Sequence, residues 1–179
     1  MAAERILAGF AEIVKCGFIG DPAILDTIEA SIERVTDPGA AEFRDVVERS
    51  IALKARVVSA DFKESGLREI LNYGHTIGHA IENLSGFAIP HGKAICIGIA
   101  VVNELAVARG ILARSDHERV LRLIDWIVDR PTWRRLGRTE HRRVVQRRCA
   151  TSGMMPPDLI STPPSTMSKD RYWRTCRRT

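Results

Sequence analysis

The sequence predicts an all-α protein, a helical bundle over residues 1–129 followed by an irregular basic extension over residues 130–179. Apolar residues recur three or four positions apart through most of the first part, which is the period of an amphipathic helix. No stretch shows the alternation of a half-buried strand. The charge also changes sign, since the first part carries 14 Lys and Arg against 19 Asp and Glu, and the second carries 13 against 3.

The first third of the chain predicts helices separated by two turns. Helical spacing runs from about residue 6 to residue 17, and Gly-Asp-Pro at 20–22 marks a break before a second helical segment that reaches about Val35. Asp-Pro-Gly at 37–39 is a turn. Residues 40–61 then form one long amphipathic helix. We expect its apolar stripe to comprise Phe43, Val46, Val47, Ile51 and Val58.

The middle of the chain predicts two further helices joined by a loop. Residues 64–84 are expected to form one helix, and a bend at its internal glycines stays open. Residues 87–93 are expected to be a loop, because Pro90 disfavours helical backbone at the residue before it. From Ala94 to Arg109 nearly every residue is apolar, which predicts a helix buried in the bundle.

A last helix is expected from Ser115 to Val128. Ser115 is placed as its N-cap, and Glu118, three residues later, would complete a capping box. The helix would close the bundle before the basic extension begins.

The composition and the N-terminal segment indicate the class of protein and its cellular compartment. A hydrophobic content of 45% and a charged content of 27% are typical of soluble globular proteins. The N-terminal segment MAAERILAGFAEIVK has charges where a signal peptide has its apolar core, and no uncharged apolar run reaches the length of a membrane span. The four cysteines form no CxxC pair and are expected to be reduced thiols. We expect a cytoplasmic protein without a membrane segment.

The extension differs in character from the bundle. Residues 133–149 are rich in arginine, and residues 154–168 contain four prolines. Two interpretations stay open: a solvated, partly disordered extension, or a change of reading frame that has replaced the native C-terminus. Nucleic-acid binding is not expected, because neither interleaved aromatic residues nor a known binding module accompanies the charge.

The segment LNYGHTIGHAIE carries the strongest signal of a functional site. His75 and His79 lie one helical turn apart, so both can point into one pocket. Gly74 and Gly78 each cost a helix about 1 kcal/mol relative to alanine, which suggests that a ligand or another backbone approaches closely there. His91 follows in a Pro-His-Gly sequence and is a third candidate metal ligand. Unrelated surface or hydrogen-bonded histidines remain the alternative.

Charged and polar residues accompany the histidines. Arg68 and Asn72 would continue the histidine face of the helix, and Lys54 lies on the preceding helix, so the group would suit an anion that carries a phosphate and a carboxylate. Glu12 and Lys15 lie three residues apart in an otherwise apolar helix. They are either part of the site or a surface ion pair of little energetic value.

Three segments in order, AGFAEIVKCGFIGD, ALKARVVSADFKESGLREILNYGHTIGHAIE and HGKAICIGIAVVNELA, closely resemble the C-terminal helical domain of the 3-dehydroquinate synthase family, a branch of the sugar phosphate cyclases. The resemblance covers about residues 5–125. It implies a divalent metal, usually zinc and alternatively cobalt, held by Glu12, His75 and His91. It also implies contacts to 3-deoxy-arabino-heptulosonate 7-phosphate from a second set of residues, namely Lys15, Lys54, Arg68, Asn72 and His79.

The implied activity is a carbon-oxygen lyase reaction of the shikimate pathway of aromatic amino acid biosynthesis, which converts this sugar phosphate to 3-dehydroquinate and phosphate. Spacing alone makes His75 and His79 joint ligands, whereas the family assigns Glu12 to the metal and His79 to the substrate. Two other interpretations stay open. One is a related sugar phosphate cyclase of secondary metabolism, and the other is an inactive metal-binding or interaction fragment.

The chain departs from the family pattern in two places that bear on the site. No GxGxxG loop or βαβ pattern is present, so NAD is expected to bind mainly to an N-terminal domain absent from this chain, supplied by a missing part of the gene or by a companion chain. A homodimer is expected of the full enzyme. Lys93 stands where the family commonly has an acidic or small residue, and it would weaken metal binding unless its side chain points away.

Overall fold

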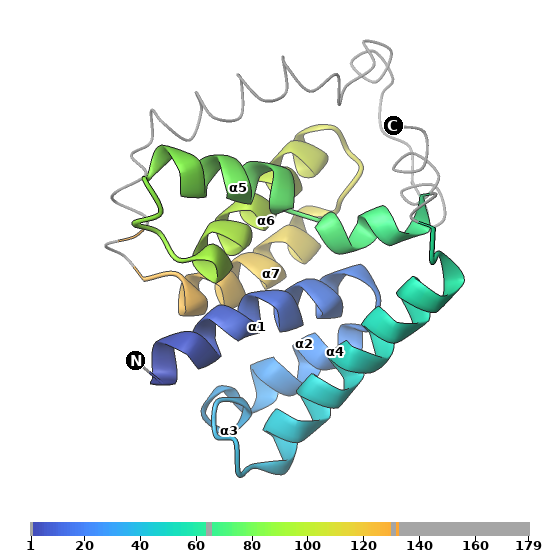
Figure 1. Ribbon diagram of the computed structural model, residues 1–179, viewed down its shortest axis with the longest axis vertical. Helices are drawn as coiled ribbons and strands as arrows, with labels where there is room; N and C mark the ends of the chain where they lie inside the picture. The colour runs from blue at the N-terminus through green and yellow to red at the C-terminus, as the bar shows by residue number, and fades with distance from the viewer. Residues whose placement is uncertain (1, 64–65, 130–131, 133–179) are drawn as a thin grey trace.

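The computed structural model describes residues 2–63, 66–129 and 132, and these residues form helices and no strand (Figure 1). The all-α prediction is therefore confirmed for this part of the chain, whereas the predicted extension from residue 130 lies almost entirely outside it. The elements are α1 (Ala2–Ile19), α2 (Pro22–Ala30), α3 (Ile32–Val35), α4 (Ala41–Ala60), the 3-10 helix η1 (Leu67–Asn72), α5 (His75–Leu84), α6 (His91–Ala108) and α7 (Arg114–Ile127).

Helix α1 runs between two groups of helices (Figure 1). On one side it packs against α6 and α7, with α5 lying along α6, and on the other side it packs against α2 and α4. Apolar side chains of all these helices meet in one core, which includes Phe10, Ile28, Val46, Ile97 and Ile124. Because α1 contacts both groups, a side chain near its middle can meet residues from α4, α5 and α6.

Helix α6 is the buried central helix that the sequence predicts. Its length of 18 residues and mean hydropathy of 1.4 would also fit a membrane span, but 61% of it is buried inside the protein. The side chains of Ile95, Ile97 and Ile99 are fully buried on successive faces. A core helix of a globular protein has these same properties.

The sequence prediction was wrong about the chain around the histidines in two respects. Residues 64–84 do not form one helix, because η1 ends at Asn72 and α5 begins at His75, with Gly74 at a φ of +79° between them. Glycine adopts this left-handed backbone without the penalty of a Cβ. His91 is not in a loop but is the first residue of α6, with Pro90 at the N-cap of that helix.

Two details of the outer helices also differ from the prediction. In α4 the buried residues are Val46, Ser50, Leu53 and Val57, while Ile51 is 62% exposed. The helix is rotated about its axis relative to the prediction, so that a neighbouring stripe faces the core. The predicted capping box is not formed, because α7 begins at Arg114 with Ala113 at the N-cap, which places Ser115 inside the first turn.

Glycines bring α5 and α6 into backbone contact. A Cβ on Gly98 would overlap the carbonyl oxygen of Gly74 and lie 2.9 Å from the nitrogen of Gly78. A Cβ on Gly78 would lie 3.1 Å from the Cα of Ile95. Of the two explanations for the helix glycines, close approach of another backbone is therefore correct. Gly92 makes a similar close approach to Ala8 of α1.

The described cysteines agree with the expectation of reduced thiols. Cys16 and Cys96 are free and buried. Burial raises the pKa of the Cys96 thiol to about 12, so it stays protonated at neutral pH.

Candidate functional site

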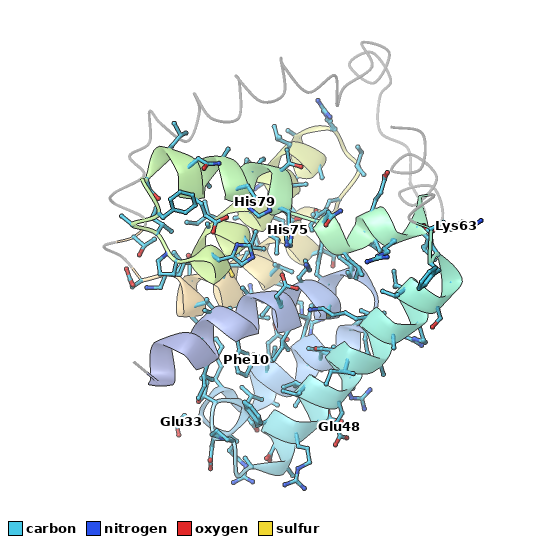
Figure 2. The ribbon with its side chains drawn as sticks, viewed as in Figure 1. Phe10, Glu33, Glu48, Lys63, His75 and His79 are labelled. Atoms are coloured by element: carbon cyan, nitrogen blue, oxygen red, sulfur yellow. The ribbon has the colours of Figure 1, made fainter. Side chains whose placement is uncertain are left out.

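His75 and His79 of α5 (Figure 2) lie close to His91, the first residue of α6. The ring centroids of His75 and His79 are 5.5 Å apart, those of His75 and His91 are 5.7 Å apart, and those of His79 and His91 are 5.6 Å apart. The close packing of α5 on α6 sets this arrangement, because it places the start of α6 beside α5. The structure thus brings together the three histidines that the sequence singled out.

Glu12 of α1 joins the histidine cluster through its carboxylate. Its Oε1 lies 3.7 Å from Nε2 of His75 and 2.9 Å from Nζ of Lys15, and its Oε2 lies 2.8 Å from Nζ of Lys54. Burial would raise the pKa of Glu12, but the hydrogen bonds from Lys54 and Lys15 outweigh it, so the pKa is lowered. Glu12 is therefore a carboxylate, and it pairs with two lysines.

Lys15 is a buried cation and not part of a surface ion pair. Its exposed fraction is 1%, and Nζ donates to Oε1 of Glu12 and to the carbonyl oxygen of Leu71. Burial lowers the pKa of Lys15, and the Glu12 carboxylate opposes that shift. The second bond ties α1 to η1, so Lys15 also helps to hold the segment that leads into His75.

His75 has one nitrogen held by the backbone and the other directed at Glu12. Its Nδ1 lies 3.3 Å from the carbonyl oxygen of Tyr73, which leaves Nε2 toward the carboxylate. Burial, followed by the charge of Lys15, lowers the pKa of His75. A neutral imidazole with a free Nε2 is the form in which histidine binds a metal.

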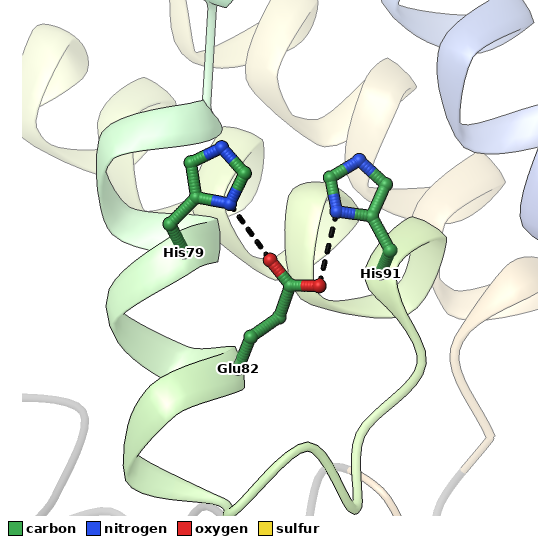
Figure 3. A group of neighbouring side chains, drawn as sticks. All are labelled: His79, Glu82 and His91. Carbon is green, nitrogen blue, oxygen red and sulfur yellow. Dashed lines mark hydrogen bonds and ion pairs between the residues drawn. The ribbon is translucent and has the colours of Figure 1, made fainter.

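Glu82 is a site residue that the sequence reasoning missed. Its carboxylate bridges two histidines, with Oε2 lying 2.8 Å from Nδ1 of His79 and Oε1 lying 3.1 Å from Nδ1 of His91 (Figure 3). Burial would raise the pKa of Glu82, but these two hydrogen bonds lower it below its ordinary value. The available signal was its position three residues after His79, on the same face of α5.

Arg68 and Asn72 lie on η1 and do not extend the histidine face. The turn at Tyr73 and Gly74 separates them from α5. Nη1 of Arg68 lies 3.5 Å from the carbonyl oxygen of Phe62, and its backbone nitrogen donates to Asp61. The side chain of Asn72 is exposed. Their expected contacts with a substrate therefore stay a prediction.

Lys93 points away from the candidate metal ligands. Its ammonium group pairs with the carboxylate of Asp129, just beyond the end of α7. The ion pair with Asp129 holds the Lys93 side chain, which is 15% exposed, in this direction. The weakening of metal binding considered from the sequence therefore does not apply in this arrangement.

The side chains of Glu12, His75 and His91 are of the types that bind zinc in catalytic sites, and their assignment to a metal stays a prediction. Two imidazoles and one carboxylate are ligands that zinc prefers, and three protein ligands leave a coordination position open. Among the described residues, the donor atoms that lie within 4.8 Å of one another belong to a different group, His79, Glu82 and His91. The two sets share His91, whose Nδ1 lies 3.1 Å from Oε1 of Glu82.

Comparison with known proteins gives consistent names. A family model described as 3-dehydroquinate synthase C-terminal matches residues 9–147. A 3-dehydroquinate synthase from Pseudarthrobacter chlorophenolicus is 48% identical over 132 residues, which cover 74% of this chain and 36% of the relative. Another from Leifsonia xyli subsp. xyli is 54% identical over 121 residues, which cover 68% of this chain and 34% of the relative. The chain thus spans about a third of the length of these curated relatives.

A solved structure shares the fold. ValA, a 2-epi-5-epi-valiolone synthase from Streptomyces hygroscopicus subsp. jinggangensis 5008 with NAD+ and Zn2+ bound, aligns with a TM-score of 0.65 at 22% identity, over 98% of this chain and 51% of that chain. Because the family model matches residues 9–147, the chain belongs to the 3-dehydroquinate synthase family, and the matching part is the family's C-terminal domain.

Proposed function

We propose that this chain forms the metal- and substrate-binding part of a 3-dehydroquinate synthase. The reaction would convert 3-deoxy-arabino-heptulosonate 7-phosphate to 3-dehydroquinate and phosphate, a lyase step of the shikimate pathway. The observation that carries the proposal is the position of His75, which lies 3.7 Å from Glu12 and has its ring 5.7 Å from that of His91, beside two lysines that pair with Glu12. The identity of 48% and 54% to enzymes of this name supports it.

We assign Glu12, His75 and His91 to the metal, which is zinc or a similar divalent ion such as cobalt. When bound, such an ion polarises a hydroxyl or carbonyl oxygen as a Lewis acid. The ligands come from α1, α5 and α6, so a metal would tie together helices that already pack around the core. The name of the ValA structure, with Zn2+ bound, supports the choice of zinc.

Five residues remain our candidates for the substrate: Lys15, Lys54, Arg68, Asn72 and His79. The side chain of Lys54 is 39% exposed and that of His79 is 56% exposed, so both can reach a ligand that arrives from solvent. Lys15 is buried, and we assign it the additional role of neutralising Glu12. A group of cations around one polar site suits a substrate that carries a phosphate and a carboxylate.

The hydride chemistry would come from NAD, as the name of the ValA structure suggests. We propose that NAD binds mainly to the N-terminal domain of the family, in the two thirds of the relatives that this chain does not match. In this proposal, that domain belongs to the full enzyme or is supplied by a companion chain. The full enzyme is a homodimer and is located in the cytoplasm.

The test measures metal content first and phosphate release second. The purified chain is analysed for zinc and then mixed with NAD, the heptulosonate phosphate and the segment of the Leifsonia xyli relative that precedes its match to this chain. We expect zinc in the chain and phosphate release only in the complete mixture, with His75→Ala as the inactive control. If the chain binds zinc but phosphate is released only from a different sugar phosphate, the result would instead support one of the related cyclases.

A further inference from the structure

Glu82 connects the two histidines that the proposed function separates into a metal ligand and a substrate contact. Its side chain is 12% exposed, whereas those of His79 and His91 are 56% and 51% exposed. The buried carboxylate is thus the fixed partner, and the two half-exposed rings depend on it for their orientation. Without this bond, an exposed imidazole would be free to rotate about its side-chain torsions.

The chemistry of the carboxylate determines which ring nitrogen carries hydrogen. An ionised carboxylate only accepts hydrogen bonds, so both Nδ1 atoms that it contacts must carry a hydrogen. In a neutral imidazole the lone pair then lies on Nε2. Figure 3 shows the second nitrogen of each ring on the side of the ring away from Glu82. Both rings therefore present Nε2 to the same region.

The bridge also crosses between two elements. Glu82 and His79 belong to α5, but His91 begins α6, and the Glu82 to His91 bond joins the helices at this end. The glycine contacts between the helices bring their backbones close together, so Glu82 near the end of α5 lies within hydrogen-bonding reach of His91 at the start of α6.

We propose that Glu82 is a positioning residue that fixes the ring orientation and the Nδ1–H form of both His91 and His79, so that one carboxylate governs metal affinity and the substrate-facing imidazole together. The inference rests on the proposed function for the roles of the two rings. The bridge itself rests on geometry alone. A carboxylate that accepts the second N–H of a metal-binding histidine commonly improves metal affinity in this way.

Direct ligation by Glu82 is the rival explanation, because its oxygens lie near His79 and His91 nitrogens. It would require both Nδ1 atoms to lose the hydrogens that the two bonds use, and it would leave Glu12 and His75 without a role at the metal. The two explanations predict different variants to lose the ion.

The first experiment is a competition titration of the full chain with Zn2+. Glu82→Gln offers one oxygen in place of two, so at most one histidine keeps its acceptor, and we expect zinc affinity to fall by about 10- to 100-fold. Glu48→Gln, an exposed residue on α4 (Figure 2), is the matched control and should bind as the wild type does. Unchanged affinity in Glu82→Gln would overturn the proposal, and so would loss of zinc there with full retention in Glu12→Gln.

The second experiment uses the wild-type chain, so its result does not depend on whether a variant folds. Nitrogen-detected NMR of the metal-free wild-type chain, above the pH range in which histidines titrate, reports the tautomer of each imidazole. We expect hydrogen on Nδ1 of His79 and His91, and hydrogen on Nε2 of His91 would overturn the proposal. This readout requires neither zinc nor turnover. A failure of the proposed function, seen as zinc retention in His75→Ala, therefore remains distinguishable from a failure of the Glu82 bridge.

Discussion

Gly98 of α6 packs against Gly74, at the start of α5, so closely that a Cβ on Gly98 would overlap the Gly74 carbonyl oxygen. This contact sets the spacing of the two helices that carry the histidines. It explains why glycine is required at positions where a helix would otherwise gain from alanine.

Gly98→Ala is therefore expected to lower the free energy of unfolding by about 1–3 kcal/mol or more, because overpacking forces the two backbones apart. Urea denaturation measures the effect. Gly9→Ala is the control, since a Cβ there meets nothing within 4 Å and α1 should gain up to about 1 kcal/mol of helix propensity. Equal stability of the two variants would show that α5 and α6 are not in backbone contact.

Lys15 and Lys54 hold the same carboxylate but differ in burial. Lys15→Met should lower the free energy of unfolding by about 1–3 kcal/mol, because the Leu71 carbonyl and one oxygen of Glu12 lose a donor in a buried place. Lys54→Met removes a partly exposed partner and should cost less than about 1 kcal/mol. Denaturation midpoints of the two variants decide the order, and the reverse order would refute the burial of Lys15.

Asp129 gives a pH prediction. Hydrogen bonds from Lys93 and from Thr132 lower its pKa to about 2 from the ordinary 3.8. A carboxyl with a lowered pKa in the folded state stabilises the protein above its unfolded pKa, and this stabilisation is lost as the pH falls through the folded pKa. The stability difference between wild type and Asp129→Asn should therefore be present above pH 3.8 and vanish toward pH 2. A constant difference across this range, measured by urea denaturation, would contradict the ion pair.

The sequence predicted the class of fold and the central helix well, because apolar periodicity depends on local spacing. Ile95, Ile97 and Ile99 are buried on different faces of α6, and a nearly continuous apolar run is the direct signature of such a helix. The stripe of α4 was less accurate. Ile51 and Ser50 are neighbours in sequence, and the rotation that buries Ser50 is decided by contacts with α1 and α2.

The candidate site was only partly predictable for a related reason. The spacing of His75 and His79 identified the histidine face, but Glu12 approaches from α1 through a contact that no local pattern encodes. Glu82 was missed because its role depends on His91, nine residues away on another helix. The break at Gly74 was open in the sequence, and only the packing on Gly98 shows why the chain turns there.

The zinc content of His75→Ala and His79→Ala, measured side by side on the full chain by elemental analysis, tests the assignment of the site most directly. Both substitutions remove an imidazole from the same helix, but His75 faces Glu12 whereas His79 is bonded to Glu82. We expect about one zinc per wild-type chain, retention in His79→Ala and loss in His75→Ala. Loss of zinc in His79→Ala with retention in His75→Ala would contradict the site built on Glu12, His75 and His91.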